Sequence, residues 1–390
     1  MSEVRLDRIF REVKDLVPSS EMDLLTPSIV HGVVRQSDLG MRPQQALREG
    51  YSLAPAKPGD FIISLSSHAH GIEWCGLYGG VSPDYTLLRP IVDIRYARYL
   101  KYALKSLYMI GQLGIFKTGV RMGLRLQWSK VRYCKIDLPT LDRATALADL
   151  LDRATSSIDT LIAKKIRFIE LLQQKRAALI TRAVTKGFDA SVPTKDSGVE
   201  WLGSIPATWS SKRLRFVCDV TTGSKDTVDA VPEGEYPFYV RSQVVERIDS
   251  YSADCEAVLT AGDGVGVGKV YHYANGKFDF HQRVYMLSNF RHVRGKFLYY
   301  YLSSLFAAVA LDGGAKSTVD SLRMPVFKNF PITIPSNDEQ DRIVRNIETR
   351  AMRIDTLIAK SERSIELLHQ RRTSLISAAV TGKIGLREAG

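Results

Sequence analysis

A long segment of this 390-residue chain occurs twice. Residues 158–185 and 354–381 agree at 19 of 28 positions, without a gap and at a constant offset of 196. Both copies contain IDTLIAK, and each follows a short β-like stretch that ends in a proline, Pro139 or Pro335. Repetition over a long period indicates one structural device built twice. We therefore expect an internal pseudo-two-fold repeat.

Each copy has the pattern of a long amphipathic helix. No Gly or Pro occurs between Leu141 and Ala183, and apolar residues recur at spacings of three and four, which define one helix face. About 42 residues at 1.5 Å rise span roughly 60 Å. Because such a stripe needs a partner, we expect the two copies to pair as an antiparallel coiled coil. The alternative is that each helix packs only on its own domain.

Polar residues that are identical at equivalent helix positions indicate a shared external partner. Helix pairing requires equivalent apolar residues, whereas it does not require equivalent surface residues. Arg176 and Arg372 interrupt the stripe at equivalent positions, where they either fix the register or cover apolar surface with their aliphatic stems. The alternative is a recent duplication in which the identities have no function. The predicted partner-binding residues are Asp159, Thr160, Lys164, Glu170, Asp355, Thr356, Lys360 and Glu366.

A region of about 135 residues that contains both strand and helix candidates precedes each long helix. The two regions are only weakly related, so the helices are copied closely and the domains before them are not. This combination is typical of a scaffold that presents two different recognition surfaces. The β-branched and aromatic strand candidates are 61–65, 85–92, 235–240 and 283–288, and the short helix candidates are 99–106 and 297–304.

The charge of the chain favours a polyanionic partner. The formal net charge is +12, and residues 1–135 hold 19 Lys and Arg against 12 Asp and Glu. The four cysteines are scattered without a CxxC pair, which predicts reduced thiols rather than a zinc site. The N-terminal residues have no apolar core, and no apolar run approaches the roughly 18 residues of a membrane span. We therefore expect a cytoplasmic protein with no membrane contact.

No catalytic or metal-binding pattern is found in the sequence. GDGVGVGK (262–269) departs from a phosphate-binding P-loop, because Asp263 stands at its first glycine position and Val270 replaces the hydroxyl residue. The glycines instead predict a tight turn or a close approach of the backbone to a partner. The chain has no Pro-Pro dipeptide, which the usual adenine-N6 methyltransferase site contains. His68 and His70 near Glu73 are expected to be exposed loop residues rather than metal ligands, so we predict no catalytic residue, metal or cofactor in this chain.

Four stretches together resemble the DNA-specificity (S) subunit of type I restriction-modification systems. They are GVEWLGSIPATW (198–209), GDGVGVGKV with FDFHQRVYML (278–287), GVSPDYTLLRP (80–90), and IELLQQKRAALI with AVTKG (169–187). The resemblance covers essentially the whole chain. It implies an α+β fold in which two mixed α/β target recognition domains are separated by two conserved spacer helices that pair antiparallel. The implied segments are recognition domains at 1–138 and 189–334 and spacer helices at 139–188 and 335–390.

The resemblance also implies a non-catalytic role in a larger complex. Each recognition domain would read one half of a bipartite site on double-stranded DNA. Two methyltransferase (M) subunits and two motor–nuclease (R) subunits are the implied partners, and S-adenosylmethionine, ATP and Mg²⁺ are expected only in them. The assembled complex would be an adenine-N6 DNA methyltransferase and endonuclease. Two alternatives remain, the recognition subunit of a type IIB-like enzyme and a helical adaptor that does not bind DNA.

Lys and Arg contacts to phosphate and a few polar contacts to base edges are the expected mode of reading. The alternative for each candidate is an ordinary surface or fold-supporting residue. Side-chain identity does not give the bases recognised without a docked pose. The predicted DNA-binding residues are His68, His70, Lys117, Thr118, Arg121 and Arg125 in the first domain, and Lys269, His281, Gln282, Arg283, Lys316 and Ser317 in the second.

Overall fold

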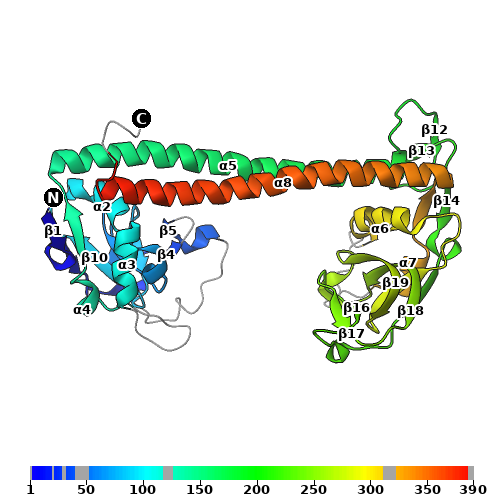
Figure 1. Ribbon diagram of the computed structural model, residues 1–390, viewed down its shortest axis with the longest axis horizontal. Coiled ribbons are helices and arrows are strands. Elements are labelled where there is room, and N and C mark those ends of the chain that lie inside the picture. Colours follow the sequence, from blue (N-terminus) through cyan, green and yellow to red (C-terminus); the bar gives the residue numbers. More distant parts are fainter. Residues whose placement is uncertain are drawn as a thin grey trace. The chain divides into compact units, whose positions relative to one another are not determined.

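Two long helices contribute to both of the units into which the chain divides (Figure 1). The computed structural model describes residues 2–19, 22–28, 32–39, 52–116, 126–310 and 322–384. Helix α5 (Leu141–Lys186) has 46 residues and helix α8 (Asn337–Val380) has 44. Gly187 and Gly382, which follow their C-terminal ends, have φ angles of 69° and 71°, a conformation that glycine adopts without strain. The two predicted long helices are confirmed.

Unit 1 comprises Met1–Ile166 and Glu362–Gly390. Its described strands form a two-stranded sheet β1-β11, a four-stranded sheet β2-β10-β7-β8 and a five-stranded sheet β3-β6-β9-β4-β5. The strands are β1 (Ser2–Arg5), β2 (Phe10–Glu12), β3 (Val17–Pro18), β4 (Leu24–Ser28), β5 (Gly32–Arg35), β6 (Ser52–Ala56), β7 (Phe61–Ile63), β8 (Glu73–Trp74), β9 (Gly79–Val81), β10 (Thr86–Pro90) and β11 (Lys135–Leu138). The short helices are η1 (Leu6–Arg8), η3 (Gln36–Leu39), α1 (Ser67–His70), η4 (Ile94–Tyr96), α2 (Ala97–Ala103), α3 (Leu107–Ile115) and α4 (Trp128–Val131).

Unit 2 comprises Arg167–Ser361. Its described strands form a six-stranded sheet β15-β20-β18-β19-β16-β17 and two strand pairs, β12-β13 and β14-β21. The strands are β12 (Thr194–Asp196), β13 (Ser204–Pro206), β14 (Ser210–Arg213), β15 (Asp219–Thr222), β16 (Tyr236–Tyr239), β17 (Glu246–Ile248), β18 (Ala253–Ala261), β19 (Tyr271–Phe280), β20 (Val284–Ser288) and β21 (Pro331–Ile334). The shorter helices are η5 (Leu214–Phe216), η6 (Thr227–Asp229), η7 (Gly264–Gly266), α6 (Gly295–Ala310) and α7 (Met324–Lys328).

The same strand pair stands before each long helix. In unit 1, β11 pairs antiparallel with β1, and the chain then enters α5. In unit 2, β21 pairs antiparallel with β14 and the chain then enters α8. Just after the first strand of each pair, the N–H of Leu6 donates to the carbonyl of Cys134, and the N–H of Leu214 donates to that of Phe330, both at 2.9 Å. The sequence repeat therefore includes the connection between each sheet domain and its helix.

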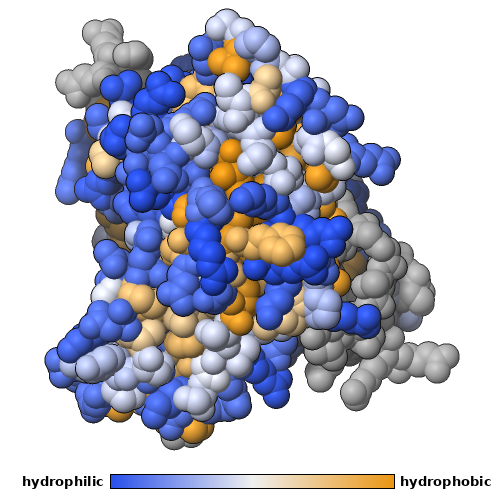
Figure 2. Space-filling model, turned by 90° about the vertical axis from the view of Figure 1, so that its right-hand side faces the viewer, coloured by the Kyte–Doolittle hydropathy of each residue, from blue (hydrophilic) through white to orange (hydrophobic). Residues whose placement is uncertain are grey.

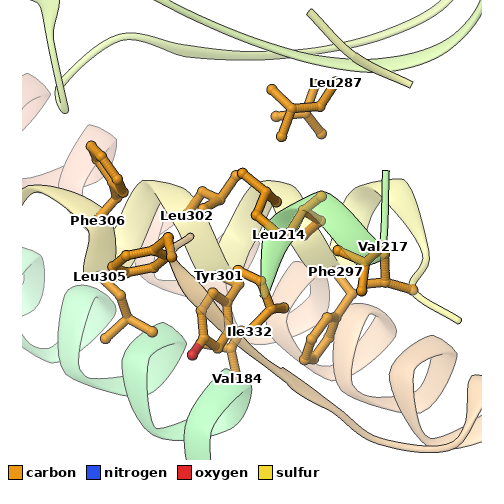
Figure 3. Packing of buried hydrophobic residues seen from close by; sticks show 14 of the residues in the cluster. Val184, Leu214, Val217, Leu287, Phe297, Tyr301, Leu302, Leu305, Phe306 and Ile332 are labelled. Atoms are coloured by element: carbon orange, nitrogen blue, oxygen red, sulfur yellow. The ribbon is translucent and has the colours of Figure 1, made fainter. Parts of the chain in front are cut away.

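The core of unit 2 joins α6 to both long helices. Figure 3 shows Phe297, Tyr301 and Phe306 of α6 packed among apolar residues from the strands and from α5. Val184 from the end of α5 and Ile347 from the first half of α8 are fully buried in this cluster. The C-terminal part of α5 and the N-terminal part of α8 therefore share one core.

The core of unit 1 uses the opposite ends of the same two helices. Leu147 and Leu151 of α5 pack in one cluster with Ile376 and Ala379 of α8. Side chains of the sheet and of α2 complete the cluster, and all of these residues are less than 5% exposed. In each unit, then, the beginning of one long helix packs with the end of the other.

The predicted fold class is confirmed as a mixed α/β chain in which a long helix separates two sheet-containing domains. The strand candidates 61–65, 85–92, 235–240 and 283–288 coincide with β7, β10, β16 and β20. A continuous coiled coil and the division of the chain at 138, 188 and 334 stay predictions. Among the described residues, no helix has the length and hydropathy to cross a membrane. The face in Figure 2 is mostly hydrophilic, with hydrophobic residues gathered across its middle.

We predict that Phe306→Ala destabilises unit 2 by about 3–5 kcal/mol, the usual effect of removing a buried phenylalanine. Phe306 is 0% exposed, and its ring centroid lies 5.1 Å from that of Phe327 and 5.0 Å from that of Phe330. The control is Phe216→Ala, because Phe216 is 54% exposed and its loss should cost less than about 1 kcal/mol. Urea unfolding followed by circular dichroism measures both. Equal midpoints for the two variants would contradict the assigned core.

Candidate nucleic-acid interface

A cluster of polar side chains lies on the loops that connect the strands of the six-stranded sheet in unit 2. Arg241 follows β16, Asp263 lies between β18 and η7, and residues 281–283 connect β19 to β20. Asp226 caps η6 at its N-terminus. We call Asp226, Arg241, Asp263, His281, Gln282 and Arg283 the polar cluster.

Asp263 stands at the centre of the cluster between two arginines. Its Oδ1 accepts a hydrogen bond from Nη1 of Arg241 at 2.9 Å, and its Oδ2 accepts one from Nη1 of Arg283 at 2.6 Å. Partial burial acts to raise the pKa of Asp263, but the hydrogen bonds from Arg283 and Arg241 outweigh it and lower that pKa. The Asp263 side chain is 18% exposed, whereas Arg241 and Arg283 are 40% and 59% exposed. The carboxylate is therefore largely covered while both guanidinium groups reach the solvent.

The glycines of GDGVGVGK shape the turn that carries Asp263. Gly264 has a φ of 74°, in the left-handed region that favours glycine. A Cβ atom on Gly266 would lie 2.6 Å from the backbone carbonyl oxygen of Arg241. The glycines thus allow the predicted tight turn, while the predicted close approach of the backbone to a partner stays a prediction. The segment that approaches closely is the Arg241 loop of the same unit.

His281 supports the cluster from beneath. Its side chain is 2% exposed, and its Nδ1 accepts a hydrogen bond from the backbone N–H of Arg283 at 2.9 Å. Because an amide can only donate, the ring proton of neutral His281 lies on Nε2, which is 3.6 Å from Oδ1 of Asp226. The imidazole therefore orders the loop and is covered from solvent.

Gln282 and Asp226 close the other side of the cluster. The side-chain amide of Gln282 donates to Oδ2 of Asp226 at 2.7 Å, and its backbone N–H donates to the Lys225 carbonyl at 2.8 Å. The pKa of Asp226 is lowered, chiefly by the hydrogen bond that its side chain accepts from the backbone N–H of Thr227. Lys269 is exposed, and its carbonyl accepts a hydrogen bond from the side chain of Gln243 at 2.9 Å. The structure therefore brings Gln282 and Arg283 into one cluster, and Lys269 into contact with a neighbouring loop.

The candidates in unit 1 are less connected. Nδ1 of His68 donates to the carbonyl of Leu65 at 3.1 Å, and His70 is exposed at the end of α1. Glu73 is buried, which raises its pKa, and Nζ of Lys105 lies 2.6 Å from its carboxylate. Within the described part of the chain, no three His, Cys, Asp or Glu residues are grouped so as to hold a metal. The remaining candidates, which lie outside the described residues of the two units, are Lys117, Thr118, Arg121, Arg125, Lys316 and Ser317.

Unit 1 has an aspartate–arginine pair of a different kind. Arg89 donates from Nε and Nη2 to both oxygens of Asp60, at 2.9 and 2.8 Å, and from Nη2 to the Pro55 carbonyl at 3.1 Å. The Asp60 side chain is 1% exposed and the Arg89 side chain 20%. This pair links β10 to β6 and to Asp60, the residue just before β7, whereas the arginines that flank Asp263 are exposed.

Two of the predicted partner-binding aspartates form ion pairs between α5 and α8. Asp159 accepts from Nε of Arg372 at 3.1 Å in unit 1, and Nε of Arg176 lies 3.0 Å from Oδ1 of Asp355 in unit 2. The second bond is the repeat equivalent of the first. The Nε–H of Arg176 is not aimed at the carboxylate, so this contact is an ion pair rather than a well-aligned hydrogen bond. Arg176 and Arg372 therefore do more than interrupt the apolar stripe.

The other predicted helix residues remain on the surface. Glu170 pairs with Arg167 at 2.7 Å, and Glu366 forms the equivalent pair with Arg363. The hydroxyl of Thr356 donates to the Met352 carbonyl of its own helix. Leucines at equivalent positions of the two helices are exposed as well, and they add apolar surface beside these polar residues. The exposed residues at equivalent positions of these helices include Thr160, Lys164, Thr356 and Lys360 and the leucines Leu161, Leu357, Leu171 and Leu367.

Sequence reasoning missed Asp226, Arg241 and Asp263 as members of the site. Asp226 and Arg241 lie in loops without a motif, and only the fold brings them to residues 281–283. Asp263 was visible in GDGVGVGK, where an acidic residue among four glycines departs from a phosphate-binding loop. The aspartate in this motif was the one sequence signal for a carboxylate that pairs with arginine side chains.

Residues 206–367 match the family model of the type I restriction modification DNA specificity domain, and this range contains the whole polar cluster. Over 182 residues the chain is 28% identical to the type I restriction enzyme EcoDI specificity subunit of Escherichia coli, and the match covers 47% of this chain and 40% of that relative. The match thus spans less than half the length of the relative.

Two solved structures share the fold over nearly the full chain. One is a chain from a structure described as the basis of complex assembly and conformational transition of the type I R-M system, with a TM-score of 0.71, 15% identity and 98% coverage of both chains. The other is the HsdS subunit from Thermoanaerobacter tengcongensis, with a TM-score of 0.53, 15% identity and coverage of 98% of this chain and 97% of that one. Residues 206–367 of this chain are thus similar to the type I restriction modification DNA specificity domain, and the fold is that of the two solved structures.

Proposed function

We propose that this chain is the DNA-specificity subunit of a type I restriction-modification complex and that each of its two sheet domains reads one half of a bipartite DNA site. The observation that carries the proposal is that the family match over residues 206–367 includes a cluster of fixed polar side chains with two exposed arginines. Arginine is the side chain that most often contacts base edges specifically. The net charge of +12 adds the attraction to phosphate that DNA binding requires.

The two domains supply different recognition surfaces on an equivalent support. Each sheet domain is joined to the long helix after it by the same kind of antiparallel strand pair. The described sheets of the two domains differ in strand number and order. Unlike surfaces on equivalent supports suit unlike half-sites. In this proposal α5 and α8 pair as an antiparallel coiled coil and set the length of the unread DNA between the half-sites. The interhelical ion pairs of Arg372 and Arg176 support that pairing.

The duplicated helix surface supports two identical partners. Thr160, Lys164 and their repeat equivalents are exposed, together with equivalent leucines. We assign these residues to the docking of two methyltransferase subunits, to which two motor–nuclease subunits are added. S-adenosylmethionine, ATP and Mg²⁺ are bound by those subunits in this proposal, and the chain itself contributes recognition without catalysis. The complex acts in the cytoplasm.

We predict that co-expression of this chain with its methyltransferase subunit produces adenine methylation at a bipartite sequence with an unread gap, because the chain supplies recognition and the partner the chemistry. Sequencing of methylated bases in the host measures this. The purified chain alone should show no turnover of S-adenosylmethionine. A single contiguous motif, or methylation that does not depend on this chain, would contradict the proposed function.

We predict that lengthening both helices widens the unread gap. Four residues inserted after Ile166, and four more after its repeat equivalent Glu362, add about 6 Å to each helix. At about 3.4 Å per base pair along the duplex, the gap should grow by one or two base pairs while both half-sites stay the same. Two-residue insertions at the same points are the control, because they rotate the apolar face by about 200° and should abolish activity. An active four-residue variant with an unchanged gap would rule out this role for the helices.

A charge swap distinguishes two roles of Asp159, which are pairing with Arg372 between the helices and contact with a methyltransferase subunit. In Arg372→Asp, two carboxylates face each other across the helices, so we expect a loss of stability and of methyltransferase binding. In the double variant Asp159→Arg with Arg372→Asp, the ion pair is restored with opposite polarity, so both should recover to within about 1 kcal/mol of the unchanged chain, the scale of exposed pairs. Thermal unfolding and pull-down of the methyltransferase subunit measure them. Recovery of stability without recovery of binding would assign Asp159 to the partner surface instead.

A further inference from the structure

We propose that Arg283 reads a guanine in the half-site recognised by unit 2, and that Asp263 and Arg241 are positioning residues which hold its guanidinium group. This inference rests on the proposed function and names the base that one part of the unit selects. It adds Asp263 and Arg241 to the residues that determine specificity. The three side chains are called the arginine fork below.

The hydrogen bonds in the arginine fork leave donors free on Arg283. Its guanidinium group carries five N–H donors, and the structure shows it donating from Nη1 to Asp263 at 2.6 Å. The Arg283 side chain is 59% exposed, so much of it is accessible to a ligand from solvent. Two adjacent N–H groups of an arginine match the O6 and N7 acceptors of guanine in the major groove. Cytosine and thymine do not present that pair of acceptors, and adenine presents a donor in place of O6.

The charge of the arginine fork favours base reading over phosphate binding. Asp263 neutralises one of the two positive charges, because the hydrogen bonds from both arginines keep its carboxylate ionised. A phosphate contact depends on unneutralised charge and tolerates a mobile side chain. A bidentate base contact depends instead on a fixed orientation. A carboxylate that lowers the net charge and fixes both guanidinium groups therefore suits the second task.

Backbone contacts also hold the arginine fork in place. The N–H of Gly262 donates to the Arg283 carbonyl at 2.8 Å, and Nδ1 of His281 accepts from the Arg283 N–H at 2.9 Å. The missing side chain of Gly266 allows the Arg241 carbonyl to approach the same turn. Recognition residues work when packing and hydrogen bonds fix them in this way. The glycine-rich turn thus has a role in specificity that requires no phosphate ligand.

The contrast with Asp60 separates this arrangement from a structural pair. Arg89 directs Nε and Nη2 to one buried carboxylate and is only 20% exposed. Asp263 divides its two oxygens between two exposed arginines. An ion pair that served the fold alone would be satisfied by the first arrangement. In the second, each guanidinium group keeps an accessible edge.

The test compares the unchanged chain with Arg283→Lys and Asp263→Asn, each co-expressed with the methyltransferase subunit. Arg283→Lys keeps the positive charge but loses the paired N–H donors of the guanidinium group. Asp263→Asn keeps both arginines but loses the ionised carboxylate that accepts from them. The matched control is Arg291→Ala, because Arg291 pairs with Asp219 elsewhere in unit 2. Sequencing of methylated sites identifies each half-site, and circular dichroism melting shows that the variants are folded.

We expect at least one guanine in one half-site, and a loss of discrimination at that position of about tenfold or more in both variants. The other half-site and the control should be unchanged. Replacing that guanine with 7-deazaguanine, which lacks N7, should weaken binding by the unchanged complex and have little further effect on Arg283→Lys. This coupling is specific to a base contact.

Three results would overturn the guanine assignment. The first is a half-site pair without any guanine. The second is an equal loss of affinity on all sequences, with a salt dependence reduced by about one phosphate contact; it would make Arg283 a phosphate ligand and leave the proposed function standing. The third is an unchanged complex without any sequence preference, which would remove the proposed function together with the guanine site.

Discussion

The fold depends on two helices that must each bury apolar residues in two separate cores. The first turns of α5 supply Leu147 and Leu151 to unit 1, and its last turns supply Val184 to unit 2. Because α5 is continuous over 46 residues, one uninterrupted helix carries apolar residues for both cores. Helix α8 repeats the arrangement from the opposite end. Either core therefore constrains the helix that the other also needs.

The long helices and several strands were predictable because their signals are local and dense. A stripe of apolar residues without Gly or Pro specifies a helix from the sequence alone, and the structure gives helices of 46 and 44 residues where about 42 were expected. Residues 61–65 and 283–288 contain β-branched and aromatic residues and form strands β7 and β20. The repeat offset also carried the strand pair that precedes each helix, because β11 and β21 occupy equivalent positions.

The candidate site was predictable only in part, because its bonds join residues far apart in sequence. Arg241 and Asp263 are 22 positions apart and meet through the fold. His281 was predicted as a DNA-binding residue, and the structure shows its ring buried with Nδ1 accepting the N–H of Arg283. Asp159 was assigned to a partner from its identity in both copies, and the structure gives that identity a second explanation in Arg372. Conserved identity between repeats does not distinguish an internal bond from an external one.

The division of Asp263 between two arginines has a consequence for how recognition can change over time. A single aspartate–arginine pair loses its balance when either member is replaced, because a partly covered charge is left without a partner. Asp263 has a second arginine, so the loss of Arg241 or Arg283 leaves its carboxylate still bonded. Either arginine can therefore be replaced by a single substitution without leaving the Asp263 carboxylate unpaired. A carboxylate with two arginine partners thus allows the recognition surface to change one residue at a time while each intermediate sequence still folds.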